Sequence, residues 1–181
     1  MIFLMMFLIC VFLALAVAGL AGFSDVRTMT IPNSYSLYII VSFLLCFCVF
    51  YIGGVKGVFG SPLSHLLSVL LTFGVTFVLY GLKMLGAGDS KFAAACAFWI
   101  SVKYLPIFLF FMTLAGAGLG LVALYVKKKK PFKSPAAGSW FAQVQGGADK
   151  VPYGVAITFG LVMAFLYSGY FSPNTLASFL S

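Results

Sequence analysis

Long apolar stretches with almost no charge run through this chain and limit what it can fold into. Hydrophobic residues make up 63% of its 181 positions and charged residues only 8%, whereas soluble domains carry about 25% charged residues. Residues 1–23 contain no charged side chain. This composition predicts an all-α, polytopic membrane helix bundle that forms a single domain over residues 1–181.

Six stretches are candidates for membrane-spanning helices. A span needs about 20 apolar residues, and the fourth stretch, at 1.5 Å per residue, reaches only about 18 Å of a roughly 30 Å core. We therefore expect residues 86–91 to dip toward membrane depth and to place Asp89 at a buried helix start. The first stretch lacks the basic start of a secretory signal, so we expect it to be retained. The predicted spans are residues 2–23, 35–52, 65–85, 92–103, 106–126 and 153–171.

Small residues recur at four-residue spacing in two of these stretches, as in membrane helices that pack closely. The positions are Ala14, Ala18 and Gly22 in the first stretch, and Gly116 and Gly120 in the fifth. We expect both sets to contact neighbouring helices.

The basic residues predict the orientation of the bundle. Six spans leave Lys56 and Lys103 on one face and all other basic residues on the opposite face. That excess marks the cytoplasmic side, so both termini are expected outside and the basic loop 127–150 inside. Lys127, Lys128, Lys129 and Lys130 are read first as this topology signal and second as a contact with anionic lipids, at roughly 1 kcal/mol per Lys. The residues on the cytoplasmic face are Arg27, Lys83, Lys91, Lys127–130, Lys133 and Lys150.

The net charge of +8 is accounted for by this topology, so no nucleic-acid partner is predicted. Cys10, Cys46, Cys48 and Cys96 lie in apolar segments without a Cys-x-x-Cys pair. They indicate neither a zinc site nor a redox motif, and we expect no metal and no organic cofactor.

Only three residues of the chain are acidic, and all are aspartates. Asp25 begins the cluster Asp25-Val-Arg-Thr-Met-Thr-Ile-Pro-Asn33, and Asp89 ends the Gly-x-Gly-Asp of Gly86-Ala-Gly-Asp89-Ser-Lys91. Two predicted spans, out and back, separate these aspartates, so both should face the cytoplasmic boundary. Asp149 lies in a polar loop beside Lys150 and is expected to be solvated.

Two carboxylates on one face can hydrolyse a peptide bond. An ionised carboxylate takes a proton from water while its protonated partner polarises the scissile carbonyl. Because two like charges at close range cannot both ionise, their pKa values split. Gly86 and Gly88 would allow backbone conformations and close approaches that a β-carbon blocks.

Four other polar or turn-forming residues lie beside the aspartates. Arg27 and Lys91 each follow an aspartate by two residues. Each is expected to hold its neighbour ionised, to orient substrate, or only to mark the cytoplasmic side. Pro32 and Asn33 are expected to shape the turn into the second span, and Asn33 is also a candidate donor to the site.

The two clusters together resemble the type IV prepilin peptidase family of Gly-x-Gly-Asp membrane aspartyl proteases. Asp25, Arg27 and Ile31-Pro-Asn33 are similar to its first catalytic block, and residues 86–91 to its second. The resemblance covers residues 22–124. The segment Lys150-Val-Pro-Tyr-Gly154 is also similar to a family segment but is less diagnostic.

The resemblance implies that Asp25 and Asp89 are the catalytic pair. It implies removal of the short basic leader of pilin-like precursors at the cytoplasmic face of the prokaryotic cytoplasmic (inner) membrane. Larger members carry a cytoplasmic insert with cysteine pairs and also methylate the new N-terminus. This chain lacks the insert, so it looks like the short, peptidase-only form that serves tight-adherence (Flp) pili, without methyltransferase activity.

Other classes of protein remain to be weighed. Presenilin-like proteases share Gly-x-Gly-Asp but also carry Tyr-Asp and Pro-Ala-Leu motifs, which do not occur here. His65 is predicted on the outer face, too far from the aspartates for a Ser-His-Asp triad, and Ser90 beside Lys91 is poor geometry for a Ser–Lys dyad. The main alternative is a small cation- or proton-coupled transporter or scaffold with boundary aspartates.

Overall fold

The computed structural model describes residues 1–53, 57–177 and 179, and over these residues the regular structure is entirely helical. The prediction of an all-α bundle is confirmed. Lys56, which was assigned to the outer face, lies outside the described residues. The helices are α1 (Ile2–Thr28), α2 (Asn33–Ile52), α3 (Pro62–Gly81), α4 (Ala87–Ala97), α5 (Leu105–Lys129), α6 (Trp140–Gln145), α7 (Tyr153–Tyr167) and α8 (Pro173–Ala177).

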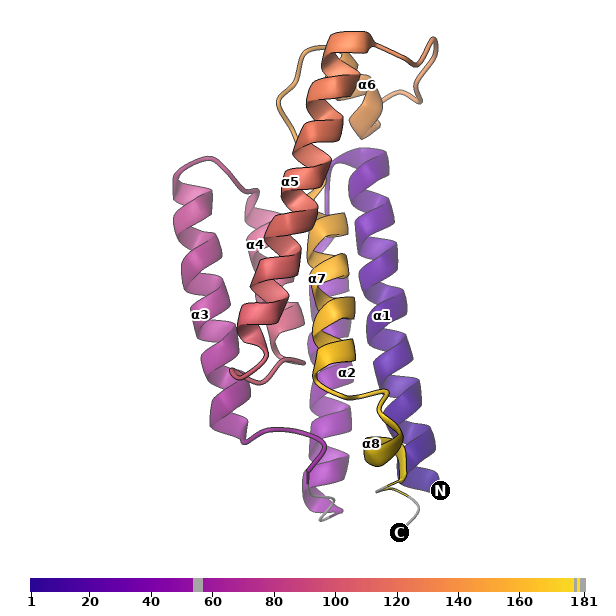
Figure 1. Cartoon of the computed structure of the whole chain (residues 1–181), viewed down its shortest axis with the longest axis vertical. Helices are drawn as coiled ribbons and strands as arrows, with labels where there is room; N and C mark the ends of the chain where they lie inside the picture. Colours follow the sequence, from indigo (N-terminus) through magenta and orange to yellow (C-terminus); the bar gives the residue numbers. More distant parts are fainter. Residues whose placement is uncertain (54–56, 178, 180–181) are drawn as a thin grey trace.

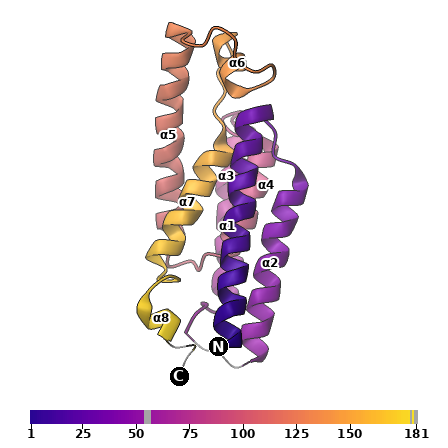
Figure 2. The ribbon, with the colours of Figure 1, turned by 90° about the vertical axis from the view of Figure 1, so that its right-hand side faces the viewer.

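The helices α1 to α5 and α7 run alternately up and down the long axis of the molecule (Figure 1). Each overlaps one of the six predicted stretches, but the predicted bounds 92–103 of the fourth are wrong, because α4 already includes residues 87–91 and ends at Ala97. The start of α1 and the short helix α8 lie at one end of the bundle, and the end of α5, with its lysines, lies with α6 at the opposite end (Figures 1 and 2). The helices α1, α2, α3 and α5 are long and apolar enough to cross a membrane, whereas α7 is a shorter apolar helix of 15 residues. That α4 and α7 also cross, and which face is cytoplasmic, stay predictions.

Local signals fix several helix boundaries. Ser61 precedes α3, and its side chain accepts a hydrogen bond from the backbone N–H of Ser64, while Pro62 occupies the first turn. Serine before a helix and proline in its first turn are both favoured at helix starts. Pro32 immediately precedes α2. At the other end of α1, Met29 adopts a left-handed conformation that stops the helix.

Close packing of α7 between α1 and α5 forms the centre of the bundle. A β-carbon on Gly22 would lie 3.3 Å from the carbonyl oxygen of Gly154, and the Thr158 hydroxyl donates a 2.7 Å hydrogen bond to the carbonyl of Ala18. On α5, Gly116 faces Tyr153 in the same way. The expected close packing is confirmed for these positions. Gly120 is different, because nothing lies within 4 Å of its β-carbon position.

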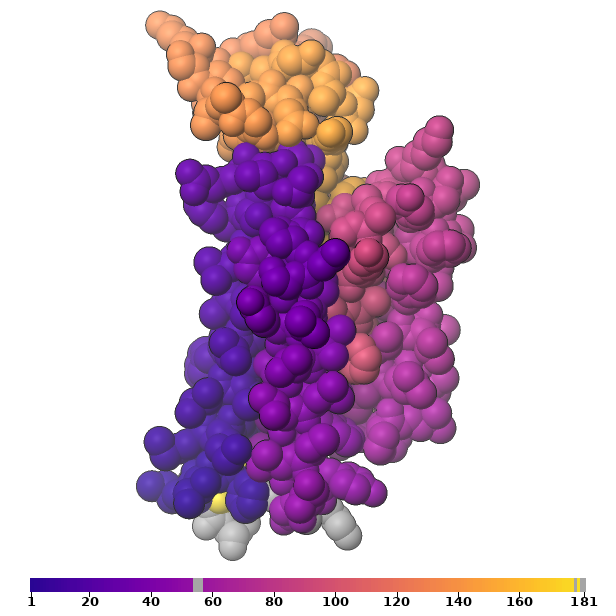
Figure 3. All heavy atoms as spheres, turned by 180° about the vertical axis from the view of Figure 1, so that it is seen from behind, coloured from indigo at the N-terminus to yellow at the C-terminus, as the bar shows by residue number. Residues whose placement is uncertain are grey.

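The short helix α4 is enclosed by its neighbours. It packs against α2, α3 and α7, and from behind it is only partly visible between α2 and α3 (Figure 3). Its residues from Phe92 to Ala97 are all buried. Enclosure by other helices, rather than length, therefore holds the start of α4 and its aspartate in position.

Substituting Gly160 by alanine should destabilise the bundle. The new β-carbon would lie 2.8 Å from the backbone oxygen of Phe108 on α5, so one helix must move, at a cost of about 1–3 kcal/mol. Gly74→Ala on α3 is the matched control, because nothing lies within 4 Å of that position and alanine gains up to about 1 kcal/mol of helix propensity. Thermal unfolding in detergent should show a lower midpoint for the first variant only; equal midpoints would contradict the close α5–α7 packing.

Candidate active site

All three carboxylates of the chain line one cavity, which we call the aspartate cavity. Its volume is about 320 Å³. It lies where the end of α1, the start of α4 and the segment preceding α7 meet. The lining residues are Asp25, Met29, Lys83, Met84, Leu85, Gly86, Asp89, Asp149, Lys150, Val151 and Tyr153.

Asp25 occupies the last turn of α1 and is only 3% exposed. Its Oδ2 accepts a 2.8 Å hydrogen bond from the backbone N–H of Gly154, in the first turn of α7. The first N–H groups of a helix have no partner within it, so this carboxylate caps α7 from another helix. The positive end of the α7 dipole also favours the negative charge.

Asp89 stands in the first turn of α4 and is half-buried. Its Oδ2 accepts a 3.0 Å hydrogen bond from the backbone N–H of Gly86, the residue before the helix. This is the reach-back contact of a capping box. The expectation that Asp89 lies at a helix start is confirmed, but this start is only partly buried, since Gly86 and Ala87 are exposed; its depth in a membrane stays a prediction.

The two aspartates influence each other electrostatically. Asp89 lies outside the four helices that are long enough to cross a membrane. The pKa of its carboxyl is raised to about 7, first by burial and second by the nearby charge of Asp25, against the opposing effect of the Gly86 N–H. A carboxyl group with this pKa exchanges its proton near neutral pH, as general acid–base chemistry requires.

The two glycines of the Gly-x-Gly-Asp segment differ in their surroundings. Neither has a positive φ, so the expected need for unusual backbone conformations is wrong. At Gly86 a β-carbon would lie 2.7 Å from Oδ2 of Asp89, so a larger residue there would displace that side chain. At Gly88 the nearest atom, the carbonyl oxygen of Ile31, would be at 3.6 Å, an ordinary contact.

Arg27 and Lys91, which follow Asp25 and Asp89 by two residues, do not line the aspartate cavity. Arg27 is exposed, and its guanidinium lies over the ring of Phe23, 5.3 Å from the centroid. Lys91 is exposed and borders a different hollow. The cations that do line the aspartate cavity are Lys83 and Lys150.

The Ile-Pro-Asn segment connects to the site mainly through its first residue. Pro32 precedes α2 and Asn33 begins it, as expected for the turn, but Asn33 borders the same hollow as Lys91. The Ile31 side chain and carbonyl instead pack against Gly154 and Gly88 respectively. Ile31 thereby links the starts of α7 and α4.

Two residues that lie at the site, Gly154 and Asp149, were not assigned to it from the sequence. Gly154 belongs to a segment that resembles the family, yet only its contact with Asp25, across 129 positions, shows what it does. Asp149 was expected to be solvated, and its side chain is 79% exposed. It pairs with Lys127 at 2.7 Å, not with the adjacent lysine, and it lines the aspartate cavity.

The residues of alternative hydrolytic mechanisms lie elsewhere. His65 is near the start of α3, at the far end of the bundle from the start of α4 (Figure 1). It is buried, with Nδ1 2.8 Å from the carbonyl oxygen of Phe98. The Ser90 hydroxyl is paired with that of Thr76 at 2.8 Å. Neither residue lines the aspartate cavity.

Comparison with known proteins identifies the family. The model of the type IV leader peptidase family matches residues 2–121, which include both aspartate clusters. The chain belongs to the type IV leader peptidase family. No curated protein and no solved structure matched it. Together with four helices long and apolar enough to cross a membrane, membership of this peptidase family indicates an integral membrane protease.

For this leader peptidase family member, Gly86→Ala should reduce peptide cleavage more than it reduces stability. The added β-carbon displaces the Asp89 carboxylate, the mobile end of a side chain, so folding costs little while the candidate catalytic group moves. We expect a loss of about 10²-fold in cleavage, the size of effect produced by a 1 Å misplacement. Gly88→Ala, which meets only ordinary contacts, should lose far less. Cleavage assays and detergent unfolding on both variants test this, and equal losses would contradict it.

The stability of the protein should fall as the pH rises from about 4 to about 7. In this window the folded protein keeps a proton on Asp89 that the unfolded chain, with a pKa of about 3.9, has released. Asp89→Asn removes this proton linkage, so its unfolding midpoint should vary less with pH. Thermal unfolding in detergent from pH 5 to 8 compares the two proteins. Parallel curves would show that Asp89 does not titrate in this range.

Proposed function

We propose that this protein is a membrane aspartyl endopeptidase that removes the short basic leader of type IV pilin-like precursors of the Flp type. The observation that carries the proposal is the meeting of Asp25 and Asp89 at one cavity, with each carboxylate held by one backbone N–H. Family membership supports a precursor of the pilin type as the substrate.

The proposed reaction uses one ionised and one protonated aspartate. The ionised carboxylate accepts a proton from water as the water oxygen attacks the carbonyl carbon of the scissile peptide, and the protonated partner donates to the carbonyl oxygen. When the tetrahedral intermediate collapses, the carboxyl that took the proton from water gives it to the leaving amine as the carbon–nitrogen bond breaks, and its partner takes a proton back from a hydroxyl of the intermediate. No covalent intermediate with the enzyme forms, and one proton remains on the pair.

The hydrogen bonds at each carboxylate support this use of the pair. Only Oδ2 of each aspartate accepts a hydrogen bond within the described residues. Oδ1 of each side chain is therefore available to water or to the peptide. Because the charge of Asp25 raises the pKa of Asp89, the proposal assigns the shared proton to the pair rather than to one residue.

The proposed location is the cytoplasmic face of the prokaryotic cytoplasmic membrane. The positive-inside distribution of Lys and Arg supports this side, since the aspartate cavity and the lysines at the end of α5 lie toward the same end of the bundle (Figure 1). The lysines Lys127–Lys130 are proposed to contact anionic lipid. The proposed activity is peptide cleavage alone, without methylation of the new N-terminus.

Replacing either catalytic candidate by asparagine should abolish processing without unfolding the protein. Asparagine keeps an oxygen that can accept the N–H of Gly154 or of Gly86, but it can neither accept nor release the proton. We expect Asp25→Asn and Asp89→Asn each to lose about 10³-fold or more in cleavage. Co-expression with a pilin-like precursor in membranes, followed by gel shift of the leader, measures this.

Asp149→Asn is the matched control, since it removes the third carboxylate of the same cavity. It breaks an exposed ion pair worth less than about 1 kcal/mol, and measurable cleavage should remain. If Asp25→Asn and Asp89→Asn both process the precursor normally, the peptidase mechanism is wrong. A transporter predicts the opposite pattern, in which neutralising either aspartate stops ion flux and leaves precursor processing unchanged.

A further inference from the structure

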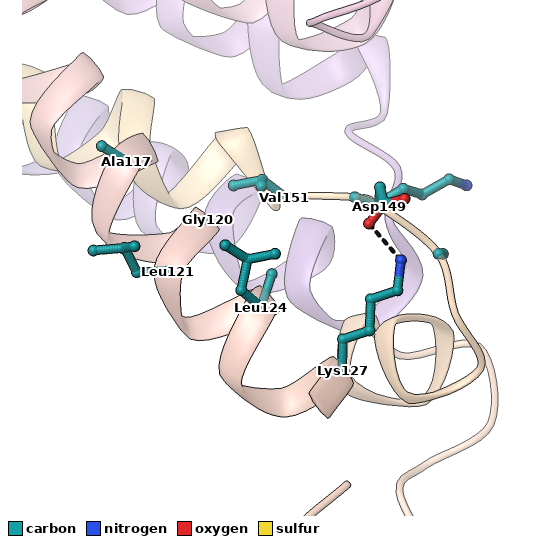
Figure 4. Close-up of a pocket in the computed structure, with 10 residues that line it drawn as sticks. Ala117, Gly120, Leu121, Leu124, Lys127, Asp149 and Val151 are labelled. Carbon is teal, nitrogen blue, oxygen red and sulfur yellow. Dashed lines mark hydrogen bonds and ion pairs between the residues drawn. The ribbon is translucent and has the colours of Figure 1, made fainter. Parts of the chain in front are cut away.

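A second hollow lies directly beside the aspartate cavity, on the outward side of α5. We call it the α5 groove. It measures about 370 Å³ and lies between the last turns of α5 and the segment 148–151 that leads into α7 (Figure 4). Its lining is Ala117, Gly120, Leu121, Ala123, Leu124, Lys127, Ala148, Asp149, Lys150 and Val151.

The α5 groove and the aspartate cavity share one wall. Asp149, Lys150 and Val151 line both. The 2.7 Å ion pair between Lys127 and Asp149 ties this wall to α5 at the polar end of the groove (Figure 4). A chain leaving that end of the groove needs only to pass residues 149–151 to reach the aspartates.

The α5 groove has the surface of a helix-packing site, and no helix among the described residues occupies it. Small residues let membrane helices approach closely, and on α5 the two candidates, Gly116 and Gly120, differ. Tyr153 fills the space beside Gly116, but nothing lies within 4 Å of the β-carbon position of Gly120. Leu121 and Leu124 beside it are 69% and 61% exposed.

The position of the groove along α5 indicates at which depth in the membrane its occupant would lie. It ends at Lys127, where the apolar part of α5 gives way to lysines. Such a change marks the boundary between hydrocarbon and water. An occupant in contact with Ala117, Gly120 and Leu121 would therefore be in the apolar layer, and its continuation past Lys127 would be in the polar layer beside Asp149.

We propose that the α5 groove binds the apolar transmembrane helix of the protein substrate and directs the polypeptide that continues from it across residues 149–151 to the aspartates. The occupant is a membrane helix rather than a soluble peptide, because the lining on α5 is apolar up to Lys127 and includes Gly120, which lets a helix approach closely. This inference rests on the proposed function only in taking the occupant to be the peptidase substrate. Gly120 is then a specificity-determining position, and cleavage occurs near the polar end of the bound helix.

Filling the groove tests this binding role. Gly120→Leu adds a side chain where the helix would lie, and nothing lies within 4 Å of its β-carbon. It should raise KM for a membrane-embedded precursor about tenfold and leave kcat within about twofold, the pattern of lost substrate binding. Gly118→Leu is the matched control, because position 118 on α5 is equally open but does not line the groove. It should change neither constant by more than about twofold.

Photo-crosslinking provides a readout that does not need catalysis. Benzoylphenylalanine placed at Leu121 in the Asp89→Asn protein should crosslink to the apolar helix of a co-expressed precursor. At Val122, which is also exposed to lipid but outside the groove, it should not.

Equal kinetics for the two leucine variants, with no crosslink from position 121, would mean that only lipid occupies the groove, and the inference would be wrong. The proposed function would still stand if the aspartate variants had lost cleavage. If the wild-type protein cleaves no precursor at all, the proposed function is wrong, and the substrate named for the groove is wrong with it.

Discussion

The hydrogen bond from the Gly154 N–H to Asp25 is the contact on which the candidate site depends. A carboxylate that is 3% exposed within an apolar bundle is costly unless it is hydrogen-bonded. The N–H groups at the start of α7, which have no partner within the helix, and the helix dipole supply that compensation. The contact also requires α1 and α7 to approach closely, which Gly22 and Gly154 permit because a β-carbon at either position would press on the other helix. The glycines and the carboxylate are therefore parts of one arrangement.

Asp89 makes the same kind of contact at the start of its own helix. In both aspartates, the structural role of the side chain can therefore be separated from its chemical role. Each aspartate uses Oδ2 to cap a helix start, so each is held in a fixed position before any substrate binds. A cap needs only an acceptor oxygen, which an amide also has, whereas proton transfer needs a carboxyl group. The structural and chemical roles of the same side chain can thus be told apart by one isosteric substitution. Such fixed placement of reacting groups is what catalysis at a membrane boundary requires.

Sequence patterns predicted the six helical stretches and the return of Asp25 and Asp89 to one end of the bundle, because hydropathy and chain direction determine both. They did not assign the surroundings of the aspartates. Arg27 and Lys91 each follow an aspartate by two residues on a helix, and residues at that spacing do not face each other. Their spacing of two residues from the aspartates therefore puts these cations on another side of the helix, away from the cavity. Gly154 and Asp149 approach the site only through the path of the chain between α5 and α7, which composition does not specify.

Only three residues of this chain are acidic, and all three aspartates line the aspartate cavity. Eleven basic residues are available, yet within the described residues the single ion pair joins Lys127 to Asp149. Asp25 and Asp89 are held by backbone N–H groups instead of by cations. A neighbouring lysine or arginine would stabilise both carboxylates in the ionised form and lower their pKa values. Lys83 and Lys150 line the cavity, but neither forms an ion pair with Asp25 or Asp89, and burial together with the charge of Asp25 raises the pKa of Asp89 to about 7. The exclusion of cations from contact with these two carboxylates is thus what leaves a proton available for acid–base chemistry.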